Sequence, residues 1–403
     1  MIMKVGFLLN RNVFYESSAS ANRWKNIITG LSNNGVKSVL YVVGGFQFRT
    51  EQEKVYKEEC CDIIYLDSTV YNGIWKNRIK AYFLDSIITY LQAKKLQRII
   101  AKENLNYLFL NGAIEVLKVY DLAFKEKCPS FKLLFEMNED PDSMDVHATN
   151  FLQKKKLKEQ KQLLQKRIFK EIDYIFFITN NLKDKYSKVV SGFNQNVYLL
   201  PMSVDMARFE NLEKRSKEEY YIAYCGSSSF HKDGVDILIK AFDILAKRQP
   251  EIKLKIAAFW ENDGVKMKAL IDNSDSKRIE YLGELSKDEI PQFIQNACVL
   301  VLPRPNSEQS NFGFPTKLGE YLATGNPVCC TKVGEIGNYL VDRYSVFFAD
   351  PGSVNSLVST IEYIILNPNK ATEVGINGKL VAYEHFDKEK QGAFLKGILI
   401  DNK

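Results

Sequence analysis

A short stretch in the second half of the chain, residues 311–328, combines residue types that suit the binding of an anion. It reads NFGFPTKLGEYLATGNPV, and a helical pattern begins there directly after Pro315. The backbone amides in the first turn of a helix carry partial positive charge, so Thr316 and Lys317 predict an anion site at that turn. Glu320 lies one turn further on. Its alternative role is to stabilise the helix by lying near the N-terminus.

A second polar turn follows the apolar run YYIAYCG of residues 220–226. It contains Gly226, Ser227 and Lys232. Lys232 is a candidate cation for a phosphate group, or else a solvated lysine of the turn. Arg304 follows the apolar run of residues 297–303 and is a further candidate cation.

The elements that must position these residues alternate between apolar runs and helical patterns. Continuous apolar runs of this length are typical of strands that are buried on both faces of a parallel sheet. The pattern therefore predicts an α/β protein with two doubly wound domains joined near residues 195–215, and a ligand at the carboxyl ends of the strands. The predicted strands are 5–10, 38–45, 62–66, 107–111, 132–137 and 174–179, then 220–226, 253–260, 279–283, 297–303 and 326–331.

Composition narrows the class of protein. With 403 residues, 45% hydrophobic and 26% charged, the chain is long enough for two folded domains. We find no signal peptide and no apolar run long enough to span a membrane. The seven cysteines include the adjacent pairs Cys60–Cys61 and Cys329–Cys330, which favours reduced thiols in a cytoplasmic protein.

The positive charge is concentrated in the first half. Residues 1–200 hold 30 Lys and Arg against 21 Asp and Glu, whereas the remainder is slightly acidic. The basic residues gather in 74–102 and 151–170. We weigh two interpretations: a solvated helix face, or peripheral contact with an anionic membrane surface or a phosphate-bearing lipid-linked substrate.

Four segments in order resemble glycosyltransferase family 4, whose members are retaining, sugar-nucleotide-dependent enzymes of the GT-B fold. They are IDYIFFITNNLKDKY (172–186), LLPMSVDMARF (199–209), YLGELSKDEIPQFIQNACVLVLPR (281–304) and FGFPTKLGEYLATGNPV (312–328). The resemblance covers nearly the whole chain and implies two Rossmann-like domains facing across a cleft. We expect an acceptor-binding domain in residues 1–200 and a nucleotide-sugar-binding domain in residues 201–385. Residues 386–403 would form a helix that packs back on the first domain.

The resemblance also implies roles for particular residues. Glu320 would accept hydrogen bonds from the donor ribose, and Lys232 would meet the donor phosphates. We expect Asn138 and Glu139, which follow the strand 132–137, near the reacting sugar. The expected catalytic residues are thus Lys232, Glu320, Asn138 and Glu139. The expected donor-binding residues are Gly226, Ser227, Lys232, Arg304, Pro315, Thr316, Lys317 and Glu320.

On the acceptor side, the turn of residues 10–24 lacks G-x-G-x-x-G, which argues against a nicotinamide-dinucleotide site. Ser20, Asn22 and Arg23 are the candidates there. Arg23 either binds an acceptor phosphate or forms an ion pair within its domain.

The chain departs from the family at two positions. Phe312 stands where the family has the first of two glutamates, and Glu308 could replace it only if this loop folds differently. Ser227 stands where the family has an arginine, so that Lys317 or Arg304 would have to compensate. Asp140-x-Asp142 mimics the metal-binding D-x-D of the GT-A fold, but a two-domain GT-B protein does not require that metal.

We therefore expect a retaining hexosyltransferase that moves a sugar from a nucleotide-diphosphate sugar to a glycan or polyprenyl-diphosphate-linked hydroxyl. Capsule, O-antigen or exopolysaccharide assembly would use it. No cofactor, metal or nucleic acid is expected. The protein would be cytoplasmic, with peripheral attachment to the inner face of the cell membrane left open. The alternatives are a catalytically silent GT-B subunit that binds a glycan or partner enzyme and, less favoured, a GT-B sugar-nucleotide epimerase.

Overall fold

The computed structural model describes residues 2–15, 18–43, 57–58, 60–66, 75–125, 129–140, 142, 151–190, 192, 196–212, 220–260 and 263–401. The chain forms two compact units. The first contains Met1–Leu200 and Gln391–Lys403, and the second contains Pro201–Lys390. His147 lies outside the described residues.

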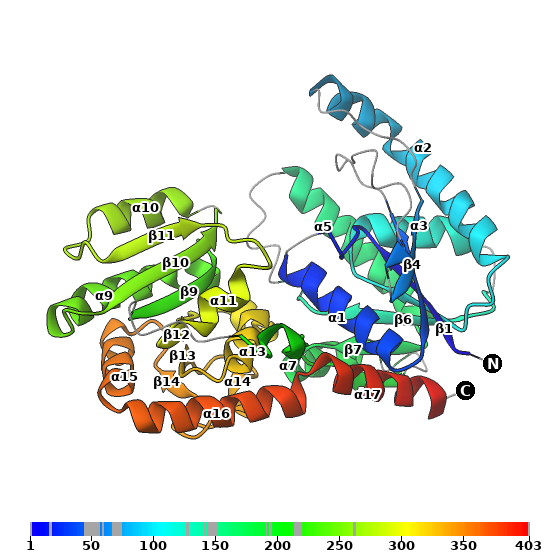
Figure 1. Ribbon diagram of the computed structural model, residues 1–403. Coiled ribbons are helices and arrows are strands. Elements are labelled where there is room, and N and C mark those ends of the chain that lie inside the picture. The colour runs from blue at the N-terminus through cyan, green and yellow to red at the C-terminus, as the bar shows by residue number, and fades with distance from the viewer. Residues whose placement is uncertain are drawn as a thin grey trace. The chain divides into compact units, whose positions relative to one another are not determined.

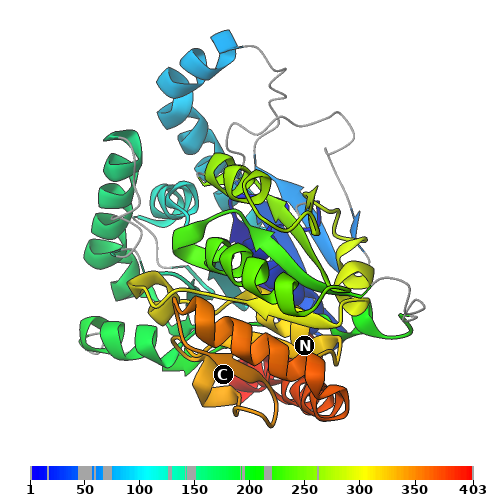
Figure 2. The same cartoon turned by 90° about the vertical axis from the view of Figure 1, so that its left-hand side faces the viewer.

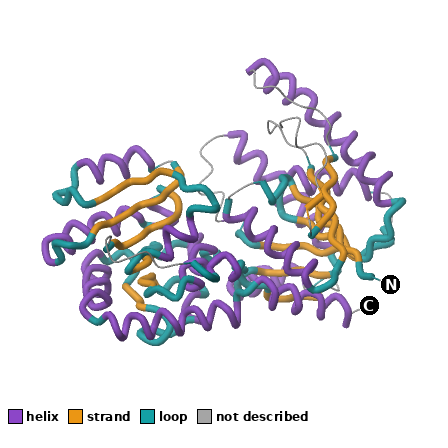
Figure 3. Tube along the Cα trace, viewed as in Figure 1, coloured by secondary structure: helices purple, strands orange, loops and turns teal. Residues whose placement is uncertain are grey.

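Within the described residues, the first unit contains a parallel sheet of eight strands in the order β3-β4-β2-β1-β5-β6-β7-β8, in which only β3 pairs antiparallel with its neighbour. Figure 1 labels its elements, and Figure 3 shows the strands in orange with purple helices beside them. The strands are β1 Lys4–Leu9, β2 Lys37–Val42, β3 Lys57–Glu58, β4 Cys61–Tyr65, β5 Tyr107–Leu110, β6 Lys132–Met137, β7 Tyr174–Phe177 and β8 Asn196–Leu199. The helices are α1 Ala19–Asn33, α2 Trp75–Ile100, α3 Ile114–Phe124, α5 Phe151–Leu163, the π-helix η2 Leu164–Ile168, α6 Phe169–Glu171, α7 Asn180–Val190 and, from Gln391 on, α17 Lys388–Asp401.

Aromatic rings fill the core of this unit. Phe109 on β5 contacts Trp24 on α1 edge to face, with ring centroids 5.0 Å apart, and contacts Phe176 on β7 at 5.5 Å. The C-terminal helix α17 adds Leu395, Ile398 and Leu399 to the same core. Its Gly392 lies against the backbone of Gly30 on α1, where a Cβ atom would approach to 2.2 Å.

The described part of the second unit contains a parallel sheet of six strands in the order β11-β10-β9-β12-β13-β14. Its strands are β9 Tyr221–Ser227, β10 Lys253–Phe259, β11 Ile279–Gly283, β12 Val299–Leu302, β13 Val328–Thr331 and β14 Phe347–Ala349. Its helices are the 3-10 helix η3 Met206–Phe209, α8 Phe230–Asp233, α9 Val235–Arg248, α10 Gly264–Asp272, α11 Ile290–Gln295, α12 Glu308–Phe312, α13 Thr316–Ala323, α14 Ile336–Tyr339, α15 Val354–Leu366 and α16 Pro368–His385. Helix α15 packs on α9, and α16, drawn in orange to red in Figure 2, packs on α13.

The segment that enters the second unit packs directly on α13. A Cβ atom at Gly319 would lie 2.2 Å from the Met202 side chain, so this glycine lets residues 201–204 lie close to the helix. The Val204 amide donates to the carbonyl of Phe386 at 2.7 Å, and Lys388 forms an ion pair with Asp205 at 2.8 Å. Residues 386–390 therefore belong to the second unit, and not to the first domain as the sequence had suggested.

The structure also bears on three features noted in the sequence: membrane spans, cysteines and the basic stretch 151–170. No helix among the described residues is long and apolar enough to cross a membrane. The cysteines in this part of the chain are free thiols. The basic stretch 151–170 is helical, and part of its charge is paired: Lys156 with Glu115, and Arg167 with Asp121 and Glu171. Lys154 and Lys155 remain exposed.

Candidate functional site

Helix α13 begins with two backbone amides that have no acceptor in the part of the chain that the structure describes. Pro315 is the residue before the helix, in an extended conformation, and it contributes no capping hydrogen bond from a side chain. Within the described residues, the amides of Thr316 and Lys317 find no acceptor. A proline cannot cap the turn, so these two donors are available to an anion at the positive end of the helix.

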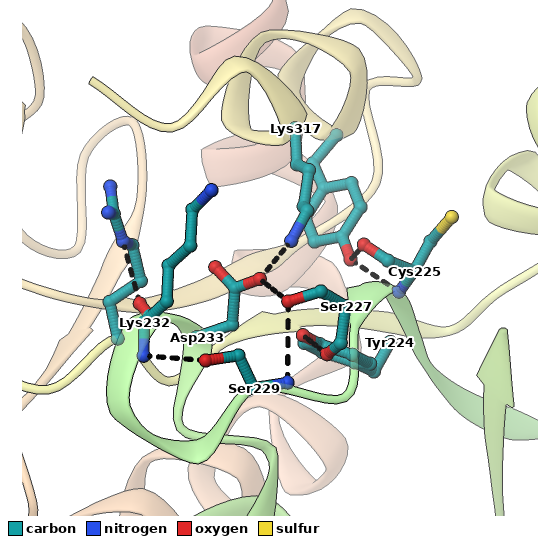
Figure 4. A network of polar contacts seen from close by, with 9 residues as sticks. Tyr224, Cys225, Ser227, Ser229, Lys232, Asp233 and Lys317 are labelled. Atoms are coloured by element: carbon teal, nitrogen blue, oxygen red, sulfur yellow. Dashed lines mark hydrogen bonds and ion pairs between the residues drawn. The ribbon is translucent and has the colours of Figure 1, made fainter. Parts of the chain in front are cut away.

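The Lys317 side chain extends from this turn to the carboxyl end of β9. Its Nζ lies 2.6 Å from Oδ2 of Asp233, the last residue of α8. Figure 4 shows the contact together with the Ser227 hydroxyl, whose Oγ donates to the same carboxylate oxygen at 2.7 Å. Lys317 therefore forms an ion pair with a carboxylate that is buried.

Asp233 remains ionised although it is buried. Burial alone would raise the pKa of its carboxyl, but Lys317 and Arg304 outweigh this effect and hold the pKa well below its ordinary value of 3.8. The hydrogen bonds from Lys317 and Ser227 act in the same direction. The turn after β9 is thus a site of fixed charge.

Arg304, the further candidate cation, is only 4% exposed, so its guanidinium lies beneath the surface. Its Nε donates to the carbonyl of Lys232 at 3.3 Å, and its Nη1 has no hydrogen-bond partner among the described residues. Burial lowers the pKa of the guanidinium, and the charge of Asp233 opposes that change. Arg304 therefore acts from beneath the surface, as a positive charge beside Asp233.

Lys232 is a cation without a partner for its ammonium among the described residues. Its side chain is partly exposed, and its ammonium forms no ion pair or hydrogen bond within the part of the chain that the structure describes. In Figure 4 the Lys232 side chain is drawn to the left of the Asp233 carboxylate, and Lys317 approaches that carboxylate from the right. The turn after β9 and the first turn of α13 thus bring together two unoccupied amides, one free ammonium and one paired ammonium.

Glu320 lies one turn further along α13 and is held by a residue that the sequence analysis did not single out. Nη1 of Arg208, on η3, donates to Oε1 of Glu320 at 2.6 Å, and its Nη2 donates to the carbonyl of Lys287 at 2.6 Å. Oε2 of Glu320 has no hydrogen-bond partner among the described residues. Arg208 lies within LLPMSVDMARF (199–209), one of the four segments that resemble the family. Its position next to Phe209 in that segment could have indicated a role for it.

The loop before α13 contains a short helix that the sequence analysis did not predict. Helix α12 is stabilised by a capping box, in which the side chains of Ser307 and Ser310 each bond the other's backbone amide. Glu308 begins this helix and is exposed, and Phe312 ends it. A role for Glu308 stays a prediction.

In the first unit, Arg23 is buried and bonds to other residues of the same unit. It is 2% exposed and forms an ion pair with Glu136 on β6, and its Nη2 donates to the carbonyl of Leu200 at 2.8 Å. The ion pair is the interpretation that the structure supports, because a buried arginine with these partners is not available to an acceptor phosphate. Ser20 is exposed in the first turn of α1, and Asn22 is partly exposed.

Asparagines follow three neighbouring strands of the first sheet. Asn10, Asn111 and Asn138 come directly after β1, β5 and β6, which are adjacent in the sheet. Nδ2 of Asn111 donates to Oδ1 of Asn10 at 3.1 Å, whereas the Asn138 amide has no partner among the described residues. Of these three asparagines, only Asn138 was expected from the sequence, together with Glu139, which is exposed.

The acidic pair that follows Glu139 is occupied by lysines. Asp140 is buried, and its carboxylate accepts from Lys185 at 2.8 Å and from the Tyr186 hydroxyl at 2.8 Å. Asp142 pairs with Lys161 at 3.0 Å and with Lys185 at 3.2 Å. The two lysines lower the pKa of Asp142, against the opposing effect of burial. Among the described residues, no group of three or more His, Cys, Asp or Glu could hold a metal ion.

Part of the second unit is similar to a known protein family. Residues 207–381 match the family described as Glycosyl transferases group 1. An uncharacterised glycosyltransferase of Methanocaldococcus jannaschii is 30% identical over 149 residues, which cover 36% of this chain and 38% of the relative. The chain spans less than two thirds of the length of the curated relatives it matches.

Solved structures resemble the whole fold. Sucrose-phosphate synthase from Thermosynechococcus elongatus superposes with a TM-score of 0.75 at 15% identity, over 99% of this chain and 98% of that one. Alr3699/HepE from Anabaena, in complex with UDP-glucose, superposes with a TM-score of 0.69 at 15% identity, over 99% and 100%. The two parallel-sheet α/β units are therefore those of the GT-B fold, which confirms the fold expected from the sequence.

Proposed function

We propose that this chain, which carries a glycosyl transferases group 1 domain in residues 207–381, is a retaining glycosyltransferase that uses a nucleotide-diphosphate sugar. The observation that carries the proposal is the first turn of α13. There the two unoccupied amides of Thr316 and Lys317 lie on the same unit as the free ammonium of Lys232 and the half-engaged carboxylate of Glu320. Together they match a diphosphate followed by a ribose.

The chemistry follows from the charges. A diphosphate carries about two negative charges, and its charge grows as the glycosidic bond breaks, so amides and a cation that meet it stabilise the transition state more than the ground state. Glu320 would accept a hydrogen bond from a ribose hydroxyl through Oε2, while Arg208 orients the carboxylate through Oε1. That the superposed Anabaena protein was solved with UDP-glucose supports this choice of donor.

We further propose that the acceptor attacks on the face from which the nucleotide leaves, with the departing phosphate taking its proton. This route needs neither an enzymic nucleophile nor a metal, and the lysine partners of Asp140 and Asp142 fit a site that does not use them as metal ligands. Asn138 and Glu139 remain our candidates on the side of the reacting sugar.

For the acceptor we propose a glycan, free or linked to polyprenyl diphosphate, in capsule, O-antigen or exopolysaccharide assembly. Amide side chains both donate and accept hydrogen bonds, as sugar hydroxyls do, so Asn10, Asn111 and Asn138 suit neutral hydroxyl groups. Ser20 and Asn22 remain candidates beside them. Arg23 is withdrawn, because Glu136 holds it.

A lipid-linked acceptor would lie at a membrane surface, and one helix face of the first unit suits such a surface. On α2, Ile87, Tyr90 and Leu91 are exposed, and the cations Lys94 and Arg98 continue the same face at helical spacing. A depression on this face is lined by Tyr90, Leu91, Lys94, Lys95, Gln97 and Arg98. Apolar residues beside cations are typical of helices that bind anionic lipid surfaces, so we propose peripheral attachment at the inner face of the cell membrane.

The second candidate function is a catalytically silent subunit that binds a glycan or a partner enzyme. Two observations keep it open: Phe312 ends α12 where a glutamate was expected, and Ser227 is committed to Asp233. An epimerase is less favoured. Among the described residues only His231 and His385 are histidines, and His385 packs among aromatic rings.

A thermal-shift panel of UDP-, GDP-, ADP- and CMP-sugars tests the proposal. A ligand at 100 times its dissociation constant stabilises the native state by about 2.7 kcal/mol, which is readily seen as a rise in melting temperature. We expect one nucleotide series to raise the melting temperature, with the parent nucleoside diphosphate giving a similar shift. If no donor shifts it, the silent subunit becomes the better account.

A further inference from the structure

The place that Lys317 occupies is defined by a glycine. A Cβ atom built on Gly226, near the end of β9, would lie 2.2 Å from Nζ of Lys317 and 2.8 Å from its Cε. It would also lie 2.8 Å from the Tyr224 hydroxyl. No side chain fits at residue 226 while the lysine keeps this position. The absence of a side chain there is what lets the ammonium lie over the strand backbone.

The other side of the ammonium is fixed by Asp233. The carboxylate is 3% exposed, and it is itself held by the hydroxyl of Ser227 at 2.7 Å. A single hydrogen bond to Asp233 uses one of the three donors of an ammonium group, so the two others remain for a ligand. Figure 4 shows the ammonium with Asp233 and Ser227 below it.

We propose that Gly226 and Asp233 are positioning residues of the donor site, which together seat the Lys317 ammonium where it meets the donor diphosphate. The inference rests on the proposed function, since it assigns the source of a cation for that site. It also provides positive charge near residue 227, where this chain has a serine and the family has an arginine. Lys317 supplies the fixed cation at the end of β9, Lys232 supplies a free one, and the buried Arg304 holds Asp233 ionised.

The position of the Lys317 ammonium between Gly226 and Asp233 has an electrostatic consequence. While Lys317 is in place, the negative charge of Asp233 is neutralised within hydrogen-bond distance. If the lysine is removed, the site loses a cation and Asp233 becomes an anion that repels the incoming diphosphate. The lysine and the aspartate therefore act as a unit, and their effects on diphosphate binding are not additive.

A double-mutant cycle on Gly226 and Lys317 tests the spatial part of the proposal. The readout is the dissociation constant, by calorimetry, of the nucleoside diphosphate that the wild type binds. We expect Gly226→Ala to weaken binding about tenfold, because the new methyl group displaces the ammonium without changing any charge. Lys317→Ala should weaken it at least as much. In the Lys317→Ala background, Gly226→Ala should add less than about twofold.

Two results would overturn the spatial part. An undiminished affinity in Gly226→Ala would show that nucleotide binding does not need the Lys317 ammonium at this position. An equal further loss in both backgrounds would show that the glycine only makes room for the ligand. Gly397→Ala serves as the control for an alanine at a glycine site, because a Cβ atom added there would meet no atom within 4 Å. Melting temperatures without ligand show whether each variant is folded.

The second cycle tests Asp233. Asp233→Asn in the Lys317→Ala background should recover at least about threefold of the lost affinity, because it removes an anion that the buried Arg304 alone then offsets. The pair Asp236 and Lys240, 3.0 Å apart on the surface of α9, is the matched control, and Asp236→Asn should recover nothing in Lys240→Ala. No recovery by Asp233→Asn would remove Asp233 from the site. Binding by the wild type itself tests the proposed function, so the two failures are distinguishable.

Discussion

Arg208 leaves Glu320 with one occupied and one available carboxylate oxygen, which defines what a substitution there should do. Glu320→Ala should weaken nucleotide-sugar binding by about tenfold or more, because a hydrogen bond from a ribose hydroxyl to a charged group contributes about 1.5–3 kcal/mol. Calorimetry measures the change. The matched control is Glu362→Ala, which removes a surface glutamate paired with Arg248 at 2.9 Å in the same unit. Equal affinities for Glu320→Ala and Glu362→Ala would place the ribose elsewhere.

Lys232 should act more on the transition state than on the bound donor, because the charge on the leaving phosphate grows during the reaction. For Lys232→Ala we expect the turnover number to fall about 100-fold while the dissociation constant of the donor rises less than tenfold. Steady-state transfer rates and calorimetry on the same preparation separate the two. A variant that turns over like the wild type would exclude Lys232 from the mechanism.

The ion pair of Asp233 has a consequence for stability that depends on pH. The folded-state pKa of this carboxyl lies below the ordinary value of 3.8, so its contribution to stability is full above about pH 4 and is lost as the pH falls through the folded-state pKa. Asp233→Asn should lower the free energy of unfolding by about 3 kcal/mol at pH 7, as breaking a buried pair does. The difference from the wild type should shrink when denaturant unfolding is repeated at pH 3. A difference of the same size at both pH values would argue against an ionised Asp233.

At the scale of elements, buried apolar runs were sufficient to predict the central strands. Strands such as YLFL of β5 and VLVL of β12 are buried along their whole length, and such runs are legible in one sequence. The strands β3, β8 and β14 were missed because they lie at the edges of their sheets and are at most four residues long. Helix α12 was missed because a serine capping box, and not an apolar face, stabilises its five residues.

For the candidate site, residues that are close in sequence could be grouped in advance, but their distant partners could not. Thr316, Lys317 and Glu320 could be grouped from the sequence because they lie in the first two turns of one helix, and local spacing is visible in the sequence. The partners Asp233 and Arg208 are 84 and 112 residues away from Lys317 and Glu320, so no local pattern could join them. Arg23 illustrates the same limit, because its partner Glu136 is 113 residues away on β6.

Helix α2 gives a prediction that belongs to a whole element. Vesicles that contain phosphatidylglycerol should bind the protein more tightly than vesicles of phosphatidylcholine alone, with about 1 kcal/mol from each cation near the surface. Leu91→Glu, or Lys94→Glu with Arg98→Glu, should abolish the preference in a flotation assay. Lys154→Glu with Lys155→Glu on α5 reverses the same number of charges on exposed residues and should leave it intact. If the α5 variant alone loses the preference for anionic vesicles, the membrane-binding surface lies on α5 and not on α2.

At the scale of the molecule, each unit offers a different chemistry at the carboxyl edge of its sheet. The second unit has unoccupied amides and cations among its described residues, and the first has neutral amide side chains. Under the proposed function, the second unit would bind the charged donor and the first the hydroxyl groups of the acceptor. The fold itself resembles GT-B structures over both units.

The central claim is that the first turn of α13 binds the diphosphate of a sugar nucleotide. The most direct measurement is a crystal structure of the wild-type chain with the nucleoside diphosphate that raises its melting temperature. We predict the diphosphate within hydrogen-bond distance of the Thr316 and Lys317 amides and of the Lys317 ammonium, with a ribose hydroxyl on Glu320. A nucleotide bound away from this turn, with these amides still unoccupied, would contradict the account.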